Sequence, residues 1–311
     1  MKRIWKIIKE WLLCRYEIGF LDNTVDDIIN GRPLNMKLMK HNFKDRWFAD
    51  PFILEVTDNT IELLVEEYYY PEQKGRICLY IVDRKDYTLL SSTPVLSLDY
   101  HLSFPLIRRE GDRVFVIPES ENAGILNKYE YDREKRRLIY VETIAVNPVA
   151  DAVVTKLFGE EYMFCTRKPD TNGVVLHIMR KTIQEYEEYQ TIDFGGRRIA
   201  RMAGDFFVYN GDVYRPAQVC QKHYGEALLL QKVRYEDGRF SFVDKCLYRS
   251  PIKRWNYGFH TLNIYKGVIV VDCQGYRHCP TLSKQINTML SCIVKIKNSY
   301  GNITCNRNDI Q

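Results

Sequence analysis

The chain has 311 residues, of which 45% are hydrophobic and 27% charged, so it can bury a sizeable core and is not a disordered segment. The formal net charge of +5 comes from basic residues scattered among acids, which does not favour a nucleic-acid-binding surface. The nine cysteines are odd in number and lack CxxC spacing, which indicates buried free thiols in a reducing compartment rather than a disulfide framework or a zinc site.

The first twenty residues alternate basic and large apolar side chains, a pattern typical of a basic amphipathic helix. The uninterrupted apolar run, Trp11 to Cys14, is too short for a signal sequence or a membrane span. Two interpretations stay open: a helix that packs on the body of the protein, or peripheral membrane contact through residues 1–13. Both predict a cytoplasmic protein, the second at the inner face of the membrane.

Residues 1–45 are predicted to comprise this helix and a closure segment. Within the segment, residues 16–20 are expected to form a short strand that completes the last unit of a ring.

From residue 46 onward one pattern occurs five times: a small or acidic residue, an apolar run, a turn and a second apolar run. Its third residues are at positions 51, 105, 152, 205 and 262, so the repeats are roughly 50 residues apart, a period typical of repeat folds and propellers. Four turn glycines keep the same step, and they are Gly111, Gly159, Gly211 and Gly267.

Each repeat contains three predicted strands, and the fifth ends with a strand near residues 291–297. Only residues 183–189 have helical character within the repeats. The sequence therefore predicts an all-β fold, a five-bladed β-propeller over residues 46–297 with a short N-terminal helix and a polar tail over residues 298–311.

Asp50 and Asp151 begin the first and third repeats at the same position. Since the innermost strand of each blade lines the central channel, the two carboxylates are expected to face each other across the axis. Such a pair suits glycosyl chemistry, in which a carboxylate activates a nucleophile. The alternative is that each Asp only caps a turn.

Other polar side chains are expected at the same end of the central channel as Asp50 and Asp151. Of Glu66 and Glu67, adjacent on a strand, only one can point inward, and Glu67 is the chosen candidate. Arginines suit bidentate contact with phosphate or carboxylate, although they could instead neutralise the inward acids. The predicted substrate-binding residues are Glu67, Arg76, Ser103, Glu119, Arg198, Arg201, Arg215 and His260. No His-rich cluster or Gly-rich phosphate loop is present, so neither a metal nor a cofactor is predicted.

Short motifs occur in order over about residues 15–275. They are Phe48-Ala49-Asp50-Pro51-Phe52, Glu66-Glu67, Lys74-Gly75-Arg76-Ile77, His101-Leu102-Ser103-Phe104-Pro105, Ile117-Pro118-Glu119-Ser120, Asp151-Ala152, Ala203-Gly204, Tyr214-Arg215-Pro216-Ala217-Gln218, Tyr224-Gly225 and His260-Thr261-Leu262-Asn263. Together they resemble the propeller domain at the N-terminus of plant glucosamine inositolphosphorylceramide transferases. Similar stand-alone bacterial proteins are associated with surface-polysaccharide assembly.

More distantly, the arrangement is similar to five-bladed arabinanases and β-xylosidases, which are inverting glycosidases. This resemblance implies a first-blade Asp as general base, a third-blade Asp that orients and tunes the acid, and a fourth-blade Glu as general acid. Asp50 and Asp151 match the first two, but the place of the acid falls near Met202, between Arg201 and Ala203. Without that proton donor, a phosphorylated leaving group held by arginines is favoured over simple hydrolysis.

The leading hypothesis is an intracellular protein of surface-polysaccharide or glycoconjugate biosynthesis that transfers a glycosyl group from a nucleotide sugar or a lipid-linked phosphate sugar. Asp50 is its predicted base, with Asp151 orienting it or the sugar. Arg198, Arg201 and Arg215 are predicted to hold the anionic leaving group. One alternative is an inverting hydrolase or phosphorylase in which Glu67 or Glu119 supplies the proton, and another is a non-catalytic sugar-binding propeller.

Overall fold

The computed structural model describes residues 14–276. The predicted amphipathic helix over residues 1–13, the predicted strand at 291–297 and the tail at 298–311 lie outside the described residues. Residues 16–274 form one compact unit. Within the described part of the chain, none of the helices has the length and apolar character needed to cross a membrane.

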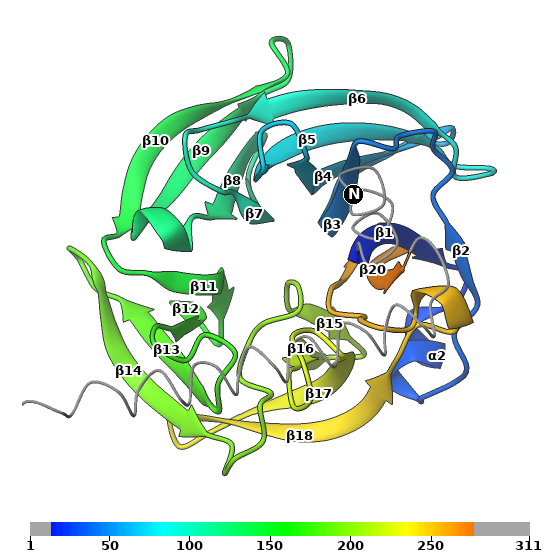
Figure 1. Ribbon diagram of the computed structural model, residues 1–311. Helices are drawn as coiled ribbons and strands as arrows, with labels where there is room; N and C mark the ends of the chain where they lie inside the picture. The colour runs from blue at the N-terminus through cyan, green and yellow to red at the C-terminus, as the bar shows by residue number, and fades with distance from the viewer. Residues whose placement is uncertain (1–13, 277–311) are drawn as a thin grey trace, which may run out of the picture. The chain divides into compact units, whose positions relative to one another are not determined.

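The compact unit is a five-bladed β-propeller of antiparallel four-stranded sheets around a central axis, as predicted (Figure 1). Blades one to four follow the chain, and each begins at the axis and ends at the outside. Their strands are β3 Arg46–Val56, β4 Thr60–Tyr69, β5 Lys74–Asp83 and β6 Leu89–Leu96; β7 Ser103–Glu110, β8 Arg113–Glu119, β9 Leu126–Asp132 and β10 Arg137–Ala145; β11 Val149–Leu157, β12 Glu160–Arg167, β13 Val175–Lys181 and β14 Tyr186–Asp193; and β15 Phe207–Tyr209, β16 Asp212–Val219, β17 Ala227–Glu236 and β18 Arg239–Tyr248.

Blade five combines strands from both ends of the described chain, in the order β19 Leu262–Tyr265, β20 Val268–Tyr276, β1 Cys14–Leu21 and β2 Met36–Leu38. The expectation that residues 16–20 form a closure strand is thereby confirmed. A short helix, α2 Val25–Ile29, connects β1 to β2 and starts with a capping box between Thr24 and Asp27. Short 3-10 turns, Glu121–Ala123 and Lys253–Trp255, complete the regular structure of the described residues.

The fourth strand of each blade is where the sequence prediction fails. Residues 183–189 were expected to be helical, but β14 Tyr186–Asp193 pairs with β13 along its full length. Glu187 and Glu188 are good helix formers, but helix propensities differ by less than about 1 kcal/mol per residue, and cross-strand pairing outweighs such a preference. Strands β6, β10 and β18 were not predicted, because their outer faces are exposed and their apolar alternation is weak.

The hydrophobic core lies between neighbouring blades. Its largest cluster extends over blades one to four, and Phe52 and Phe104 meet edge to face at 5.0 Å between adjacent inner strands. Two smaller clusters fill the blade four to five and blade five to one interfaces. Burial between sheets therefore joins each blade to the next.

Two consecutive arginines of β7 join blade two to the other four blades. Arg108 donates to the carbonyl of Val154 in blade three and to Asp205 beside blade four, with 2.6 Å between Nη1 and Oδ2. Arg109 donates to the carbonyl of Ile53 at 2.8 Å, and its guanidinium lies 3.8 Å from the centre of the Tyr265 ring. These contacts hold the inner strands together near the end of β7.

A β-bulge with positive φ interrupts the inner strand of blades one to three, near the start of β7 and β11 and at the fifth residue of β3. The residues are Asp50 (φ 49), Phe104 (φ 42) and Asp151 (φ 44), and each lies in a register shift of its strand pair. Such left-handed conformations cost free energy for a residue with a side chain. The bulge turns a backbone N–H away from its own sheet, so another acceptor is needed.

Blade four has Gly204 at this place, with φ 135. A Cβ there would overlap the carbonyl oxygen of Leu262, because the backbones of blades four and five meet here and Leu262 N–H donates to Ala203 at 2.7 Å.

Replacing Gly204 with alanine is therefore expected to lower the free energy of unfolding by about 3 kcal/mol or more, through backbone strain and overpacking. Equilibrium urea unfolding measures this. Gly111→Ala is the matched control, since Gly111 has φ 62 and a Cβ there would meet no atom within 4 Å beyond its chain neighbours, so its cost should be about 1 kcal/mol. Equal losses in both variants would contradict the close approach at Gly204.

Candidate active site

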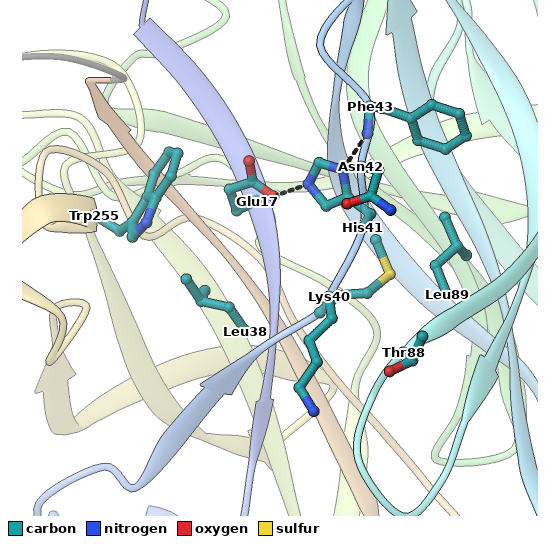
Figure 2. A pocket seen from close by; sticks show the side chains of 10 residues that line it. Glu17, Leu38, Lys40, His41, Asn42, Phe43, Thr88, Leu89 and Trp255 are labelled. Atoms are coloured by element: carbon teal, nitrogen blue, oxygen red, sulfur yellow. Dashed lines mark hydrogen bonds and ion pairs between the residues drawn. The ribbon is translucent and has the colours of Figure 1, made fainter.

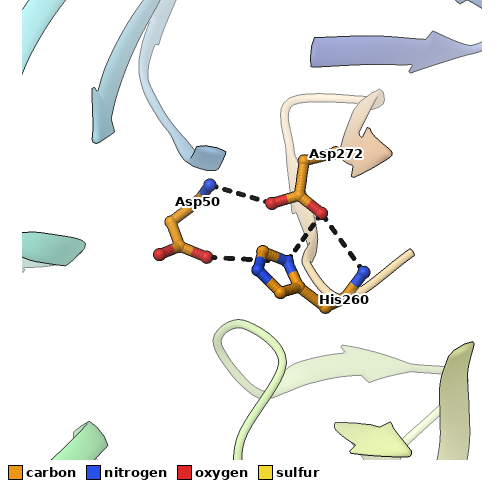
Figure 3. Close-up of side chains that lie close together, drawn as sticks. All are labelled: Asp50, His260 and Asp272. Carbon is orange, nitrogen blue, oxygen red and sulfur yellow. Dashed lines mark hydrogen bonds and ion pairs between the residues drawn. The ribbon is translucent and has the colours of Figure 1, made fainter. Parts of the chain in front are cut away.

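Two clusters of buried polar side chains lie where the inner strands begin, at one end of the ring, here called the mouth. The Asp50 cluster consists of Asp50, His260, Thr261 and Asp272. Figure 3 shows Asp50, His260 and Asp272. The Asp151 cluster consists of Glu119, Asp151, Arg201 and Gln218. Each combines residues from non-consecutive parts of the chain, because different blades supply them.

Asp272 organises the Asp50 cluster. Its Oδ2 accepts the bulge N–H of Asp50 at 2.9 Å, and its Oδ1 accepts the N–H groups of His260 and Thr261 at 3.2 and 3.0 Å. The same Oδ1 lies 2.8 Å from Nδ1 of His260, which places a proton on that nitrogen. Blade five thereby fixes both the histidine ring and the backbone that carries Asp50.

The Asp50 carboxylate accepts hydrogen bonds at both oxygens. Thr261 donates its hydroxyl to Oδ1 at 2.7 Å, and the bulge N–H of Phe104 donates to Oδ2 at 3.3 Å. Nδ1 of His260 lies 3.9 Å from Oδ1. Asp50 is thus held from blades two and five while its own backbone belongs to blade one.

Burial and the surrounding acids give this cluster unusual protonation. Burial raises the pKa of Asp50 to about 8, against the attraction of His260. Burial alone lowers the pKa of His260, but the Asp272 carboxylate outweighs it and raises that pKa to about 9. Near neutral pH the cluster therefore holds protons that the same groups would release in water.

One nitrogen or oxygen from each of Asp50, His260 and Asp272 lies within 4.8 Å of the others, which is close enough for a cation. The donor set fits poorly, because Asp272 already accepts the N–H groups of three residues and the His260 nitrogen facing both acids carries a proton. A cation would have to displace this proton and several hydrogen bonds. The geometry suits a proton-sharing group better than a metal site.

In the Asp151 cluster, Arg201 grips Asp151 through two hydrogen bonds, Nε to Oδ2 at 2.6 Å and Nη2 to Oδ1 at 3.2 Å. Gln218 donates to Oδ2 at 2.6 Å, and Glu119 accepts the bulge N–H of Asp151 at 2.6 Å. Burial would raise the pKa of Asp151, but the arginine lowers it below its usual value.

Glu119 responds in the opposite direction. Burial and the charge of Asp151 raise its pKa well above the usual value, although Arg201 lies 3.5 Å away. Ser103, another predicted binding residue, donates to Oε1 of Glu119 at 3.3 Å. Two neighbouring carboxyl groups thus have pKa values shifted in opposite directions, which is typical of paired acid and base groups.

A row of rings continues from the Asp50 cluster along blades five and one. Tyr16 stacks on His260 at 4.7 Å, and Trp47 lies 5.2 Å from Tyr16 and 4.9 Å from Tyr68. Near its end, His101 Nδ1 accepts the N–H of Gly75 and His101 Nε2 lies 3.1 Å from Oε1 of Glu66. A row of aromatic rings therefore extends from His260 to Tyr68.

In blade one, the predicted binding residues Glu67 and Arg76 pair with each other, and Glu67 is not the acid that faces the mouth. The predicted inward side chain, Glu67, lies inside the blade, where Arg46 and Arg76 pair with it at 3.2 and 2.7 Å and Tyr80 donates to it at 2.6 Å. Its neighbour Glu66 is the one whose charge acts on Asp50. The alternation of side chains along β4 did not show which of the two acids faces the mouth. Arg46 of β3 and Arg76 of β5 pair with Glu67 and so leave Glu66 on the side of the mouth.

The predicted arginines are also mostly engaged elsewhere. Arg215 is fully buried inside blade four, where it donates to Gln231 at 2.6 Å and to the carbonyl of Ala200, and burial lowers its pKa to about 9. Arg198 pairs with Asp170 at 3.0 Å, but 42% of its side chain is exposed. Arg201 reaches the mouth and is committed to Asp151, which is the ion-pair alternative stated above.

Sequence reasoning missed the roles of Gln218, Thr261 and Tyr224, and it did not choose Glu66 or Asp272 as site residues. A usable signal existed for the acids. Glu66 pairs with Ala49 and Glu119 with Ser103, while the N–H of Asp272 donates to the carbonyl of Thr261, so these acids share one position on the second strands.

A pocket of about 810 Å³ lies where β1, β2 and β6 meet, and none of its lining residues belongs to either cluster (Figure 2). His41 there accepts the N–H of Phe43 at Nδ1 and lies 2.8 Å from Oε2 of Glu17 at Nε2. The His41 ring in this pocket therefore has a protein partner at both of its nitrogens.

Residues 34–247 match the family model described as glucosamine inositolphosphorylceramide transferase 1, N-terminal. The chain belongs to this family. The Arabidopsis thaliana transferase is 26% identical over 195 residues, covering 60% of this chain and 25% of that protein. The Oryza sativa subsp. indica transferase is 22% identical over 201 residues, covering 61% of this chain and 27% of that protein. The chain thus matches about a quarter of the length of these relatives.

Solved structures with the same fold include glycosidases. RS223 β-xylosidase has a TM-score of 0.53 at 11% identity, over 74% of this chain and 92% of that one. CoXyl43, a GH43 β-xylosidase/α-arabinofuranosidase from a compost microbial metagenome solved with xylotriose, has a TM-score of 0.52 at 11% identity, over 76% and 92%. At such low identity these similarities establish the fold alone.

The protonation of the Asp50 cluster predicts that stability falls as pH rises from about 6.5 to 9. Asp50 (pKa 3.8 unfolded, about 8 folded) and His260 (6.5 unfolded, about 9 folded) both bind protons more tightly in the folded chain. Thermal unfolding across this range should show a falling Tm, with a smaller fall in Asp50→Asn. A Tm that rises with pH over this range would contradict these protonation states.

The second cluster predicts that Arg201→Met destabilises the fold by about 3 to 5 kcal/mol near neutral pH, because Asp151 is left as a buried, uncompensated charge. Urea unfolding measures the loss. The double variant Arg201→Met with Asp151→Asn should recover much of the stability, since the buried charge is then gone. Additive losses in the double variant would show that the pair is not coupled.

Proposed function

We propose that the mouth is a carbohydrate site in which Asp50 acts as a general base that deprotonates an attacking hydroxyl, from water or from a sugar. The observation that carries this proposal is a buried carboxyl group whose pKa is raised to about 8 and whose oxygens are positioned by Thr261 and Phe104. A base is most effective when its pKa lies near the working pH.

The proposed proton donor is Glu119. Burial and the ionised Asp151 beside it raise its pKa well above the usual value, which favours the protonated form that an acid needs. Glu119 takes the role of the acid for which the fourth blade has no carboxylate near Met202. Asp151, clamped by Arg201, is a fixed charge that tunes Glu119 rather than a base.

A glycosidic leaving group fits this site better than a phosphorylated one. Arg201 is bound to Asp151, Arg215 lies inside blade four, and Arg76 is paired with Glu67. An anionic leaving group would therefore find these three arginines already paired, in a mouth where Asp151 stays ionised. We accordingly propose acid–base cleavage or transfer of a glycosyl group on a glycan or glycoconjugate, with inversion.

A second candidate is glycosyl transfer from a phosphate-activated sugar in glycoconjugate or surface-polysaccharide assembly. Two observations favour it. The matched relatives are named transferases, and the exposed side chain of Arg198 at the mouth remains accessible to an anion. Since those relatives are about four times as long as the matched region, their activity is not assigned to this part of them.

The test uses the full chain with glycosides, oligosaccharides, nucleotide sugars and sugar phosphates. Ligands are found by a rise in Tm, and turnover is then measured for each ligand. Asp50→Asn is expected to lower kcat by about 10²- to 10⁴-fold while the chain stays folded, because the amide can still accept from Phe104 and donate to Thr261. In the wild type, kcat/KM should rise with pH through an apparent pKa of about 8.

Asp212→Asn is the matched control, since this carboxylate is 41% exposed on blade four and pairs with Lys232. Release of a free sugar that Glu119→Gln also abolishes supports the acid–base proposal. Turnover of a phosphorylated donor that is insensitive to Glu119→Gln supports the second candidate. Full activity of Asp50→Asn, or sugar binding with no turnover, would overturn the catalytic role of Asp50.

A further inference from the structure

The loop over residues 220–226, between β16 and β17, is held at the mouth by contacts along its length. The N–H of Cys220 donates to Arg198 at 2.8 Å, and that of Glu226 donates to Val219 at 2.9 Å. His223 stacks on Tyr257 at 4.2 Å, and its Nε2 lies 2.6 Å from the Tyr257 carbonyl oxygen. The loop is therefore held in one position at the mouth by its contacts with the rest of the fold.

Gly225 brings this loop directly onto the Asp50 cluster. Its φ is 61, and a Cβ at this position would lie 2.7 Å from Cδ2 of His260. Its carbonyl accepts the N–H of Phe259 at 2.8 Å, so the loop joins the segment that carries His260. Only a residue without a side chain permits this approach.

Tyr224 is consequently placed between the two clusters. The guanidinium of Arg201 lies 4.9 Å from the centre of its ring, and the ring of His260 meets it nearly edge to face at 5.2 Å. One neighbour belongs to the Asp151 cluster and the other to the Asp50 cluster. The ring is held by contacts on both sides, so its orientation is set before any ligand binds.

The ring of Tyr224 is held on both sides, but its hydroxyl is available to a ligand. Within residues 14–276 it forms no hydrogen bond, although the side chain is only partly exposed. Burial and the charges of Asp151 and Asp50 raise its pKa well above the usual value, despite the opposing effect of Arg201. It therefore remains a proton-bearing donor within electrostatic range of both acids.

From these contacts we infer that Tyr224 is a substrate-contacting residue whose hydroxyl donates a hydrogen bond to an uncharged sugar oxygen between the two clusters. A neutral acceptor is favoured because the ionised carboxylate of Asp151 would repel an anion. The inference rests on the proposed carbohydrate site and extends it, since it names a specificity-determining donor on the blade-four loop. Loss of such a donor weakens binding of the matching oxygen.

The test is Tyr224→Phe, which keeps the ring and removes only the hydroxyl. For the sugar that most raises the Tm of the wild-type chain, Kd and KM are expected to rise about tenfold, as for one lost hydrogen bond. The Tm without ligand and the apparent pKa of about 8 in the pH profile should stay unchanged, which a merely structural role would not predict. The matched control is Tyr140→Phe, whose residue is 56% exposed on blade two and whose hydroxyl bonds Thr143.

A deoxy analogue of the same sugar sharpens the result. If Tyr224 donates to one hydroxyl, the analogue that lacks this hydroxyl should bind wild type and Tyr224→Phe equally. Unchanged Kd in Tyr224→Phe would overturn the inference and leave the role of Asp50 intact. Weaker binding by Tyr224→Phe together with full turnover by Asp50→Asn would overturn the base assignment and leave Tyr224 as a contact. Absence of any stabilising sugar would overturn both.

Discussion

The mouth of this propeller depends on one recurring hydrogen bond, in which a carboxylate of one blade accepts the bulge N–H of the next. Asp272 does this for Asp50, Asp50 for Phe104, and Glu119 for Asp151. Each acceptor satisfies a donor that the left-handed backbone turns away from its own sheet. Blade five, built from both ends of the described chain, supplies the first of these acceptors and so links ring closure to the site.

This arrangement places carboxyl groups where burial is high, and their pKa values separate as a result. Asp151 stays ionised because Arg201 and Gln218 hold it, whereas Asp50 and Glu119 keep their protons more tightly than in water. The same side chains therefore have a structural role and an acid–base role. A substitution at the mouth must be interpreted for both, which is why the amide at position 50 is more informative than alanine.

The arginines illustrate how a residue type can suggest one chemistry and serve another. Several arginines near two acids suggested an anionic ligand, but three of them neutralise or support groups of the protein itself. An unpaired buried carboxylate destabilises the folded chain whether or not a ligand is bound, because it has lost its hydration. Pairing such carboxylates therefore takes up the arginines. Arg198, at the exposed rim, is the exception.

The sequence by itself determined the five repeats, their turn glycines, the closure strand and the placing of Asp50 and Asp151 at the start of inner strands, because each follows from local periodicity and turn chemistry. It could not determine which of Glu66 and Glu67 faces the mouth, or that β14 forms a strand paired with β13 rather than a helix. It also could not determine that Tyr224 and Gln218 contact residues of other blades. Those outcomes depend on partners distant in the chain, Arg46 and Arg76 for Glu67 and β13 for β14. Only closure of the ring brings such partners together, since contacts between blades are set by sheet packing and leave no periodic trace in the sequence.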